Sequence, residues 1–406
     1  MIINGDALTV LKRMDDESID CTITSSPYYS PGKGLRQYEA DEDKTPIAPV
    51  LWPDGWEGTL GLEPTPQEFV SHLVTVCDEI YRVTKPTGSL LFNIGDSRAG
   101  SGKGPSGKNA LIKNQEDRQG FVGKSQKNPE GFKPKDMFGV PFRLGMELQK
   151  RGWYWRDCIP WLKRNGAIMS YKDRTVTSIE WILILAKTGR NYYDHIGVMQ
   201  QASESYNKDK RPRGVLRQRA NPNTKYDREE NQYKKQDDTG NPTYTGLNAR
   251  YAENGSCDKR LLRSSDFFFK TWQGLWCDEE GSPLALVVNP TAHLWKHTAG
   301  FPVALPKVLM EAYSSEAGNC ELCGSPLIRK AHKEYSEDGR TYQIITDGWE
   351  PLCKCGALAT PALIMDPFSG TSATGVACKL TGRDYIGIEI SPRYYGYGEQ
   401  RIKEGK

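Results

Sequence analysis

Four cysteines in the last quarter of the chain have the spacing of a metal site. Cys320 and Cys323 form one close pair, Cys353 and Cys355 form a second, and a glycine follows each pair. Four thiolates in this pattern suit tetrahedral zinc and leave no coordination position open for a substrate. The sequence therefore predicts a structural zinc ion held by these four residues. A redox-active dithiol or four unrelated cysteines are the alternatives.

A segment near the C-terminus has the composition of a cofactor-binding turn. Apolar Leu363–Met365 leads into Asp366-Pro367-Phe368-Ser369-Gly370-Thr371, and a helix is expected over Thr374–Leu380. Small residues let a ligand approach the backbone, and a helix N-terminus offers free N–H groups. Glu389 ends the next predicted strand, where an acid commonly accepts hydrogen bonds from the ribose of an adenosine-containing cofactor. This unit contains no G-x-G-x-x-G, so a pyrophosphate is not indicated, and an ordinary tight turn is the alternative.

A third candidate site, Ser25-Ser26-Pro27-Tyr28, follows a predicted strand over Ile19–Thr24. Because proline has no N–H, it leaves a carbonyl acceptor free in the preceding turn. The Ser25 hydroxyl, the Ser26 carbonyl and the flat ring of Tyr28 could together hold an exocyclic amino group and stack on its base. A Ser-Pro turn without chemistry is the alternative.

Hydrophobic periodicity predicts an α/β fold that places these segments at strand ends. Thr65, Pro66 and Glu68 have the pattern of a helix N-terminus with a capping box, and that helix is expected to reach about Val83. Further helices are predicted over Ala7–Met14, Phe138–Arg151 and Ala299–Tyr313, further strands over Ile2–Ile3, Ser89–Ile94, Trp153–Leu162, Ile179–Ala186 and Tyr385–Glu389, and a turn over Lys85–Gly88.

Length and composition favour a globular protein of two to three domains. The 406 residues are 37% apolar, the mean hydropathy is −0.63, and no apolar run is long enough to cross a bilayer. Met1–Asp6 has no basic stretch followed by an apolar one, so a signal peptide is not expected. Ten cysteines are too few for a disulfide scaffold. An intracellular, cytoplasmic protein without membrane contact is therefore expected.

The net charge of +3 conceals two basic segments. Residues 98–135 carry nine Lys and Arg against three Asp and Glu, and residues 201–270 carry fifteen against ten. Both segments are polar and lack regular periodicity, and the first is predicted to be a mobile loop. Positive charge concentrated in this way favours a polyanionic partner, although two solvated loops would have the same composition.

Taken in order, these blocks resemble one family, the permuted β-group of DNA amino-methyltransferases. The N-terminal block consists of Gly5-Asp6 and Ile19–Tyr28, and the segment His297–Pro302 resembles the one that precedes the family's cofactor strand. The remaining matches are Glu63–Asp96, Phe138–Lys187, Asp366–Thr374, Gly382-Arg383, Gly387–Glu389 and Tyr394. Ser26 stands where the family usually has a proline, and Ser372 where it usually has a second glycine.

The resemblance implies a Rossmann-like, circularly permuted sheet that binds S-adenosylmethionine. It implies direct methyl transfer to an amine of a flipped-out base in double-stranded DNA, with Ser25, Ser26, Pro27 and Tyr28 as the catalytic motif. The implied cofactor-binding residues are Asp6, Phe301, Asp366, Phe368, Ser369, Gly370, Thr371 and Glu389. Serine at the first motif position is typical of members that make N4-methylcytosine, so cytosine is preferred and N6-adenine is the alternative.

The resemblance also implies a division of the chain. Residues 1–199 would be the catalytic part of the methyltransferase domain and 200–290 the target-recognition region, with Arg211, Arg213, Arg217 and Arg219 as candidate DNA contacts. Residues 291–319 would return to the methyltransferase domain, 320–356 would be a zinc-binding insertion, and 357–406 would bind the cofactor.

Two readings of other kinds stay open. A catalytically weakened zinc protein that binds DNA on a methyltransferase fold is one, and a nicotinamide- or flavin-dependent oxidoreductase with a zinc ribbon is the other. The family occurs in bacteria and their phages, so a cognate restriction endonuclease is a candidate partner.

Overall fold

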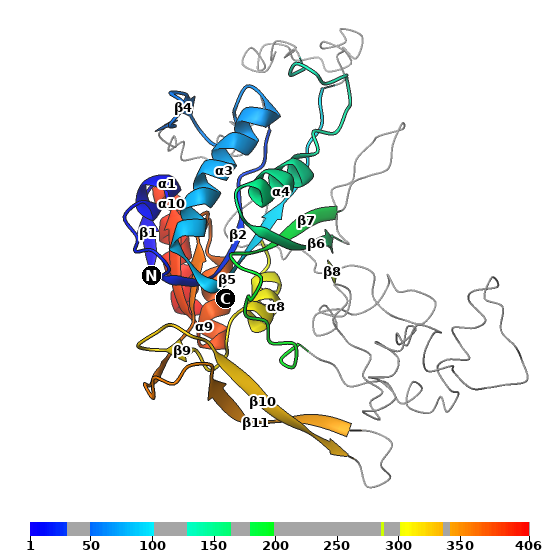
Figure 1. Ribbon diagram of the computed structural model, residues 1–406. Coiled ribbons are helices and arrows are strands. Elements are labelled where there is room, and N and C mark those ends of the chain that lie inside the picture. The colour runs from blue at the N-terminus through cyan, green and yellow to red at the C-terminus, as the bar shows by residue number, and fades with distance from the viewer. Residues whose placement is uncertain are drawn as a thin grey trace, which may run out of the picture.

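The computed structural model of the protein describes residues 1–30, 49–100, 128–163, 179–198, 286–287, 301–335 and 342–405. Its centre is an eight-stranded sheet in the order β1-β14-β13-β2-β5-β7-β6-β8 (Figure 1). The strands are β1 (Ile2–Asn4), β14 (Asp384–Glu389), β13 (Leu363–Asp366), β2 (Ile19–Ser25), β5 (Thr84–Ile94), β7 (Ile179–Ala186), β6 (Tyr154–Leu162) and β8 (Leu286–Val287).

The first five strands in that order are parallel, and β7 is antiparallel to both β5 and β6. The N-terminal strand β1 pairs with β14, near the C-terminus, and the Met1 ammonium donates to the Tyr385 carbonyl at 2.7 Å. β13, also late in the chain, pairs with the early strand β2. One continuous sheet is therefore built from both ends of the chain, which confirms the expected permuted α/β fold.

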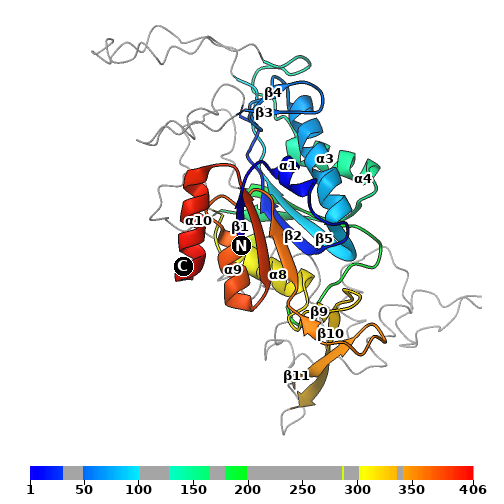
Figure 2. The ribbon, with the colours of Figure 1, turned by 90° about the vertical axis from the view of Figure 1, so that its left-hand side faces the viewer.

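Helices cover both faces of this sheet, as Figure 2 shows. One core contains apolar side chains of α1 (Ala7–Leu11), α3 (Pro66–Val83) and α4 (Val140–Lys150). The other contains side chains of α8 (Ala304–Tyr313) and α9 (Ala373–Thr381), with α10 (Pro392–Glu404) packed beside it. Alternate residues of one strand enter different cores: Leu90 and Phe92 face the first, and Leu91 faces the second.

The N-terminus of α3 confirms the expected capping box. The Thr65 hydroxyl accepts from the Glu68 N–H at 3.1 Å, and the Thr65 N–H donates to the Glu68 carboxylate at 2.9 Å. The predicted turn at Lys85–Gly88 was wrong, because β5 already begins at Thr84. The pairing of β5 with β2 is irregular there, passing from Ile19↔Thr84 to Cys21↔Ser89, and this bulge explains the turn-like sequence.

Two helices differ from their expected bounds by several residues, and a third was not expected. α1 ends at Leu11 and not at Met14, and α8 starts at Ala304 and not at Ala299. The helix α10 was not predicted, because its two glycines and low apolar content weaken the helical pattern. Its N-terminus does carry a usable signal, because the Ser391 hydroxyl caps the helix and Pro392 occupies the first turn.

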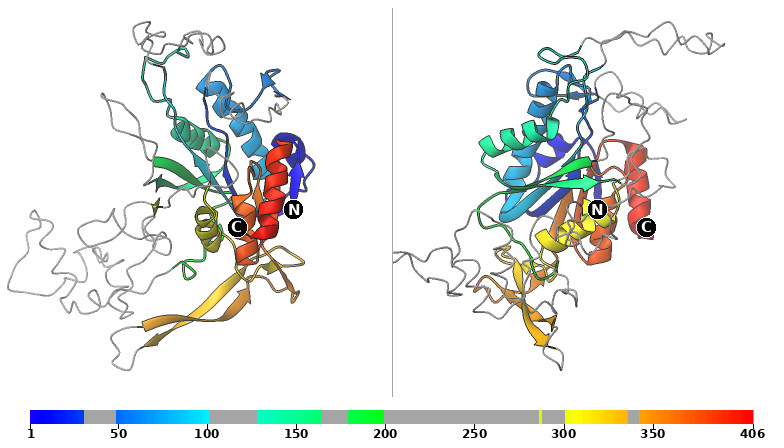
Figure 3. Two further views of the ribbon diagram at one scale, coloured as in Figure 1. Left: turned by 180° about the vertical axis from the view of Figure 1, so that it is seen from behind. Right: turned by 90° about the vertical axis from the view of Figure 1, so that its right-hand side faces the viewer.

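Three two-stranded sheets lie outside the main one. β3 (Val50–Leu51) pairs with β4 (Glu57–Gly58), β9 (Asn319–Cys320) with β12 (Ala359–Thr360), and β10 (Leu327–Tyr335) with β11 (Tyr342–Pro351). The β10–β11 hairpin extends away from the main sheet (Figure 3), at the end of the molecule opposite β3–β4. No helix in the described ranges is long and apolar enough to cross a membrane.

Candidate active site

The carboxyl ends of the parallel strands meet at one edge of the sheet. Ser25 ends β2 and pairs in register with Asn93, close to the end of β5, while Asp366 ends β13 and Glu389 ends β14. Open α/β sheets bind ligands at this edge, beside the point where the strand order reverses. The predicted cofactor-binding turn and the Ser25–Tyr28 segment are therefore on the same side of the molecule.

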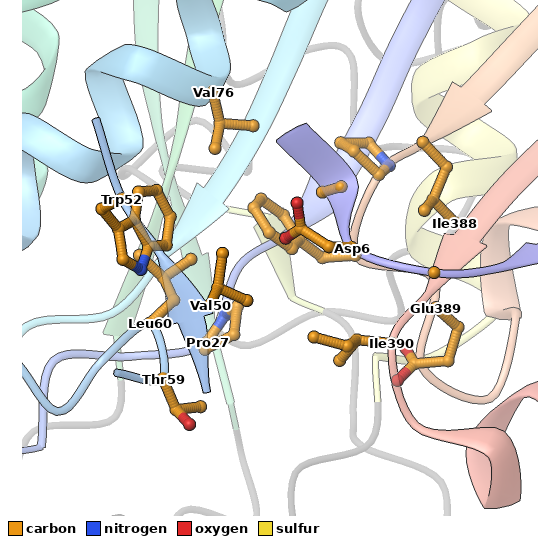
Figure 4. Close-up of a pocket in the computed structure, with 14 residues that line it drawn as sticks. Asp6, Pro27, Val50, Trp52, Thr59, Leu60, Val76, Ile388, Glu389 and Ile390 are labelled. Carbon is orange, nitrogen blue, oxygen red and sulfur yellow. The ribbon is translucent and has the colours of Figure 1, made fainter. Parts of the chain in front are cut away.

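A pocket opens at this edge between β14 and the β3–β4 segment. Four of the expected site residues line it: Asp6, Pro27, Phe368 and Glu389. Figure 4 shows Val50, Trp52 and Leu60 on one side of the pocket and Ile388, Glu389 and Ile390 on the other. The wall formed by residues in and around the β3–β4 segment was not predicted, because its short, irregular sequence gives no periodic signal.

Glu389 is the buried acid of this pocket. One carboxylate oxygen accepts the Gly370 N–H at 2.7 Å, and the other accepts the Ser391 N–H at 2.8 Å. Burial raises the pKa of Glu389 to about 7, although both hydrogen bonds act in the opposite direction. Each oxygen keeps acceptor capacity, so a pair of hydroxyl groups on a ligand could bind there.

Asp366 does not line the pocket, and its carboxylate is engaged by neighbouring groups of the protein. Its carboxylate accepts from the Thr24 hydroxyl at 2.6 Å, the Thr374 hydroxyl at 2.8 Å and the Phe368 N–H at 3.1 Å. Burial raises its pKa to about 6. These bonds join β13 to β2 and to α9, so Asp366 holds the turn in position.

Three other residues expected to bind the cofactor have side chains that make contacts outside the pocket lining. The Ser369 hydroxyl contacts the Tyr385 hydroxyl at 2.8 Å, and the Thr371 hydroxyl accepts from Arg401 of α10 at 3.0 Å. Phe301 packs edge-on against Trp161, with ring centroids 6.2 Å apart. None of these three side chains lines the pocket.

The backbone at Ser372 explains why the family usually has glycine there. Its φ is 57°, in the left-handed region that favours glycine, and its hydroxyl lies 2.5 Å from the Ser369 hydroxyl. The side chain is fully buried. The hydrogen bond thus offsets part of the backbone strain.

Ser372→Gly is expected to change the free energy of unfolding by less than about 1 kcal/mol, because relief of left-handed strain offsets the lost hydrogen bond. Ser372→Ala keeps the strain and loses the bond, so it should destabilise the protein by about 1–2 kcal/mol. Urea unfolding of both variants measures the difference. An alanine variant more stable than the glycine variant would contradict this account.

The Ser25–Tyr28 segment belongs to a polar cluster that only the fold assembles. The Tyr28 hydroxyl donates to Glu180 at 2.5 Å, and the Asn93 amide lies 3.1 Å from both the Ser25 hydroxyl and Glu180. Burial, and then the Glu180 carboxylate, raise the pKa of Tyr28 well above its ordinary value, so the phenol stays a hydrogen-bond donor. Asn93 and Glu180 were missed because each follows an ordinary strand pattern.

Two buried polar atoms of this region have no protein partner within the described ranges. They are the Ser26 hydroxyl and the carbonyl oxygen of the Asn93 side chain. Buried polar atoms are normally hydrogen-bonded, so an unpaired acceptor beside Ser25 is suited to a ligand N–H.

A second cluster supports the Trp52 side of the pocket. His72 of α3 is buried and stacks against Trp52 and Trp56, with ring centroids 4.3 and 5.0 Å away. Its Nδ1 lies 3.0 Å from a Glu63 oxygen, and its Nε2 lies 3.1 Å from an Asp54 oxygen. The histidine therefore fixes the β3–β4 segment to α3.

The four clustered cysteines come together as expected. Their sulfur atoms all lie within 4.8 Å of one another. A tetrahedral zinc ion with bonds of about 2.3 Å needs sulfur separations of about 3.8 Å, so small adjustments would complete the site. Gly324 and Gly356, which follow the two pairs, have φ of 68° and 67°, the left-handed turn conformation that glycine allows.

Some expected residues lie outside the described ranges. These are the candidate DNA contacts Arg211, Arg213, Arg217 and Arg219, most of the basic segment 98–135, and His297–Gly300.

Comparison with known proteins identifies the relatives of this chain. A family model for DNA methylases of the N6 and N4 type matches residues 19–321 and 341–400. Type II methyltransferase M.Cfr9I of Citrobacter freundii is 38% identical over 200 residues, which cover 49% of this chain and 58% of that protein. M.SmaI of Serratia marcescens is 34% identical over 205 residues, which cover 50% and 61%. The alignments thus span little more than half the length of these relatives.

Among solved structures, the cytosine-N4-specific PvuII DNA methyltransferase aligns over 100% of this chain and 93% of its own, with 12% identity and a TM-score of 0.47. The sheet built from both chain ends, with its pocket at the strand ends, defines a permuted α/β methyltransferase fold. The family model spans most of the chain, and the chain belongs to the DNA methylase family of N6 and N4 methyltransferases.

Proposed function

We propose that the protein is a site-specific DNA methyltransferase that transfers a methyl group from S-adenosylmethionine to the N4 amine of cytosine in double-stranded DNA. One observation carries the proposal. Pro27 lines the same pocket as Glu389, while its neighbours Ser25 and Tyr28 belong to the adjoining polar cluster. The pocket for the methyl donor and the cluster for the amine that accepts the methyl group would therefore share one wall.

The pocket fits an adenosine-type cofactor. Glu389 offers acceptors for the two ribose hydroxyls, Asp6 lies between the walls where a base would sit, and Phe368 and Trp52 supply apolar surface. S-adenosylmethionine supplies an electrophilic methyl group when it is bound. Asp366, Ser369, Gly370 and Thr371 would hold the turn around it, whereas the Phe301 side chain does not line this pocket.

The chain's own residues would hold the target amine in the adjoining cluster. A base extruded from the duplex would stack on Tyr28, and extrusion costs a few kcal/mol. The Ser25 hydroxyl and the Ser26 carbonyl would accept the two N–H bonds, which turns the nitrogen lone pair toward the cofactor pocket. Positioning and polarisation dominate such a reaction, because an amine conjugated with the ring is a weak nucleophile.

Serine at position 25 supports cytosine as the target, and adenine is the second candidate. The experiment is methyl transfer from labelled S-adenosylmethionine to mixed-sequence DNA, with nucleoside mass spectrometry of the product. N4-methylcytosine is expected, and Ser25→Ala should reduce the yield. N6-methyladenine would overturn the target base and keep the reaction class. Cofactor binding without any product would favour the alternative of a weakened DNA-binding protein.

We propose the target-recognition role for residues 200–290. Their Arg, Asn, Gln and aromatic content suits phosphate and base-edge contacts, with Arg211, Arg213, Arg217 and Arg219 as candidates. The flanking parts, residues 1–199, 291–319 and 357–406, would form the methyltransferase domain. If the methylation protects DNA, a cognate restriction endonuclease would be a partner of the protein. Nuclease digestion of DNA before and after methylation tests this protective role.

We also propose that 320–356 is a zinc-binding insertion. The family model skips residues 322–340, a stretch that includes Cys323 and part of the chain that separates the two cysteine pairs. The Gly324 N–H donates to the Cys320 carbonyl at 2.8 Å, so the first pair already has a tight turn. The four thiolates would complete a closed, structural site.

The purified protein is expected to contain one zinc ion per chain. Cys323→Ser should lose most of that zinc and lower the melting temperature, because metal binding at a structural site contributes directly to folding. Elemental analysis and thermal unfolding measure both effects. Cys158→Ser, a half-buried cysteine outside the cluster, is the control and should keep its zinc. Full zinc occupancy in Cys323→Ser would refute this assignment.

A further inference from the structure

We infer that Glu180 of β7 is a positioning residue for methyl transfer, which orients Tyr28 directly and Ser25 through Asn93. This inference rests on the proposed function. Glu180 lies far from the motif in sequence, 152 residues from Tyr28. The antiparallel pairing of β7 with β5 brings it to the edge of the sheet that carries the site.

The carboxylate of Glu180 is fully engaged by neighbouring side chains. One oxygen accepts the Tyr28 hydroxyl at 2.5 Å and the Asn93 amide at 3.1 Å, and the other pairs with the Lys163 ammonium. Lys163 itself lies over the Trp161 ring, 4.4 Å from its centroid. The Glu180 side chain is only 12% exposed. This carboxylate is therefore held in a single orientation.

The donor and acceptor roles in this cluster follow from that carboxylate. An ionised carboxylate only accepts hydrogen bonds and an ammonium only donates them, so Tyr28 and Asn93 must both donate to Glu180. The NH₂ group of Asn93 then faces Glu180, the Tyr28 hydroxyl at 3.2 Å and the Ser25 hydroxyl at 3.1 Å. The Ser25 oxygen is thus an acceptor for the amide, and the rotation of its hydroxyl is restricted.

The same orientation determines where the other end of Asn93 points. Its carbonyl oxygen must face away from Glu180, and this atom is buried without a partner in the described part of the chain. Asn93 as a whole is 1% exposed. One N–H of an amine held beside Ser25 could donate to this oxygen in place of the Ser26 carbonyl. Glu180 therefore presents a further acceptor to the substrate without touching it.

Packing also restricts the position of the Tyr28 ring. The ring packs closely against Gly95, the residue that follows β5, because a Cβ atom at that position would lie only 3.0 Å from the ring. The hydroxyl bond to Glu180 fixes the remaining tilt of the ring. A stacking platform with a fixed tilt sets the plane of the base, and displacements of about 1 Å at such sites cost about 100-fold in rate.

The test compares Glu180→Gln with the wild type in single-turnover methylation of DNA. The substitution keeps the shape but leaves Lys163 without its carboxylate partner and lets the amide of Asn93 turn. The methylation rate should fall about 10- to 100-fold, while the affinity for S-adenosylmethionine and the melting temperature stay near those of the wild type. Glu147→Gln is the matched control, because Glu147 also pairs with a lysine, Lys150 at 2.7 Å, on the exposed face of α4.

A double-mutant cycle separates positioning from general damage. If Glu180 acts through the Tyr28 hydroxyl, Glu180→Gln should have a clearly smaller effect in a Tyr28→Phe background. A Glu180→Gln rate equal to that of the wild type would overturn the inference and leave the proposed function intact. Equal effects in both backgrounds, or a fall that only parallels a loss of thermal stability, would also overturn it. A wild-type protein that methylates no DNA would instead overturn the proposed function, and this inference with it.

Discussion

Glu389→Ala is expected to weaken binding of S-adenosylmethionine by about 100-fold or more. Hydrogen bonds to a charged group contribute about 1.5–3 kcal/mol each, and the ribose would make two of them to this carboxylate. The substitution also strips the Gly370 and Ser391 N–H groups of their acceptor, which loosens the turn around the pocket. Isothermal titration calorimetry measures the affinity.

The control for this prediction is Glu57→Ala, which removes an exposed acid from β4 on the opposite side of the pocket. Its affinity should match that of the wild type. An affinity of Glu389→Ala within about threefold of the wild type would show that the ribose binds elsewhere, since even one such bond is worth more than that.

The raised pKa of Glu389 adds a pH dependence to the same prediction. With a pKa of about 7 in the free protein, the carboxyl is largely protonated at pH 6 and ionised at pH 8. Ribose hydroxyls donate to the ionised form, so cofactor affinity should rise as the pH rises through 7. Glu389→Gln should bind weakly with little change over this range. A wild-type affinity that is flat from pH 6 to 8 would contradict the assignment.

The same raised pKa has the opposite effect on the stability of the free protein, which should fall as the pH rises. Burial raises the pKa of Glu389 from 4.5 to about 7 and that of Asp366 from 3.8 to about 6. A raised carboxyl pKa means that the folded state binds the proton more tightly than the unfolded state. These two contributions to stability are therefore complete at low pH and are lost as the pH rises through about 6 to 7.

His72→Leu should lower the free energy of unfolding by about 1–3 kcal/mol, the usual cost of leaving a buried hydrogen-bonding group without its partner. Both ring nitrogens of His72 lie within hydrogen-bond distance of a carboxylate oxygen, 3.0 Å from Glu63 and 3.1 Å from Asp54. Leucine removes both contacts, and the Glu63 side chain, which is 0% exposed, loses its histidine partner and is left with backbone donors such as the Gly61 N–H at 2.8 Å. Urea unfolding followed by tryptophan fluorescence measures the loss.

The effect of His72→Leu should extend to the cofactor pocket. Trp52 both stacks on His72 and lines the pocket, so a loosened β3–β4 segment should also weaken cofactor binding, by less than Glu389→Ala does. His195→Leu, at an exposed histidine, is the control and should leave both stability and affinity unchanged. If His72→Leu is as stable as this control, the two carboxylates must be satisfied without the histidine.

The sequence alone determined the elements whose signals are local. Thr65, Pro66 and Glu68 place the start of α3, because a capping box depends on residues three positions apart. The apolar run that ends at Ser25 places the motif at a strand end, and the two cysteine pairs indicate a common metal site. In each case the physical cause lies within a few neighbouring residues, or in a ligand spacing that zinc itself imposes.

The tertiary structure alone decided which side chains meet at the site. Asp366 has the sequence context of a ligand contact, yet Thr24 and Thr374 occupy its carboxylate and keep it behind the pocket. Glu180 and His72 occupy ordinary positions in a strand and a helix, and their sequence neighbours say nothing of their partners. Their roles arise because sheet pairing and core packing bring together residues far apart in the chain. Once buried, a carboxylate or imidazole must find a hydrogen-bond partner, and only the fold determines which one is within reach.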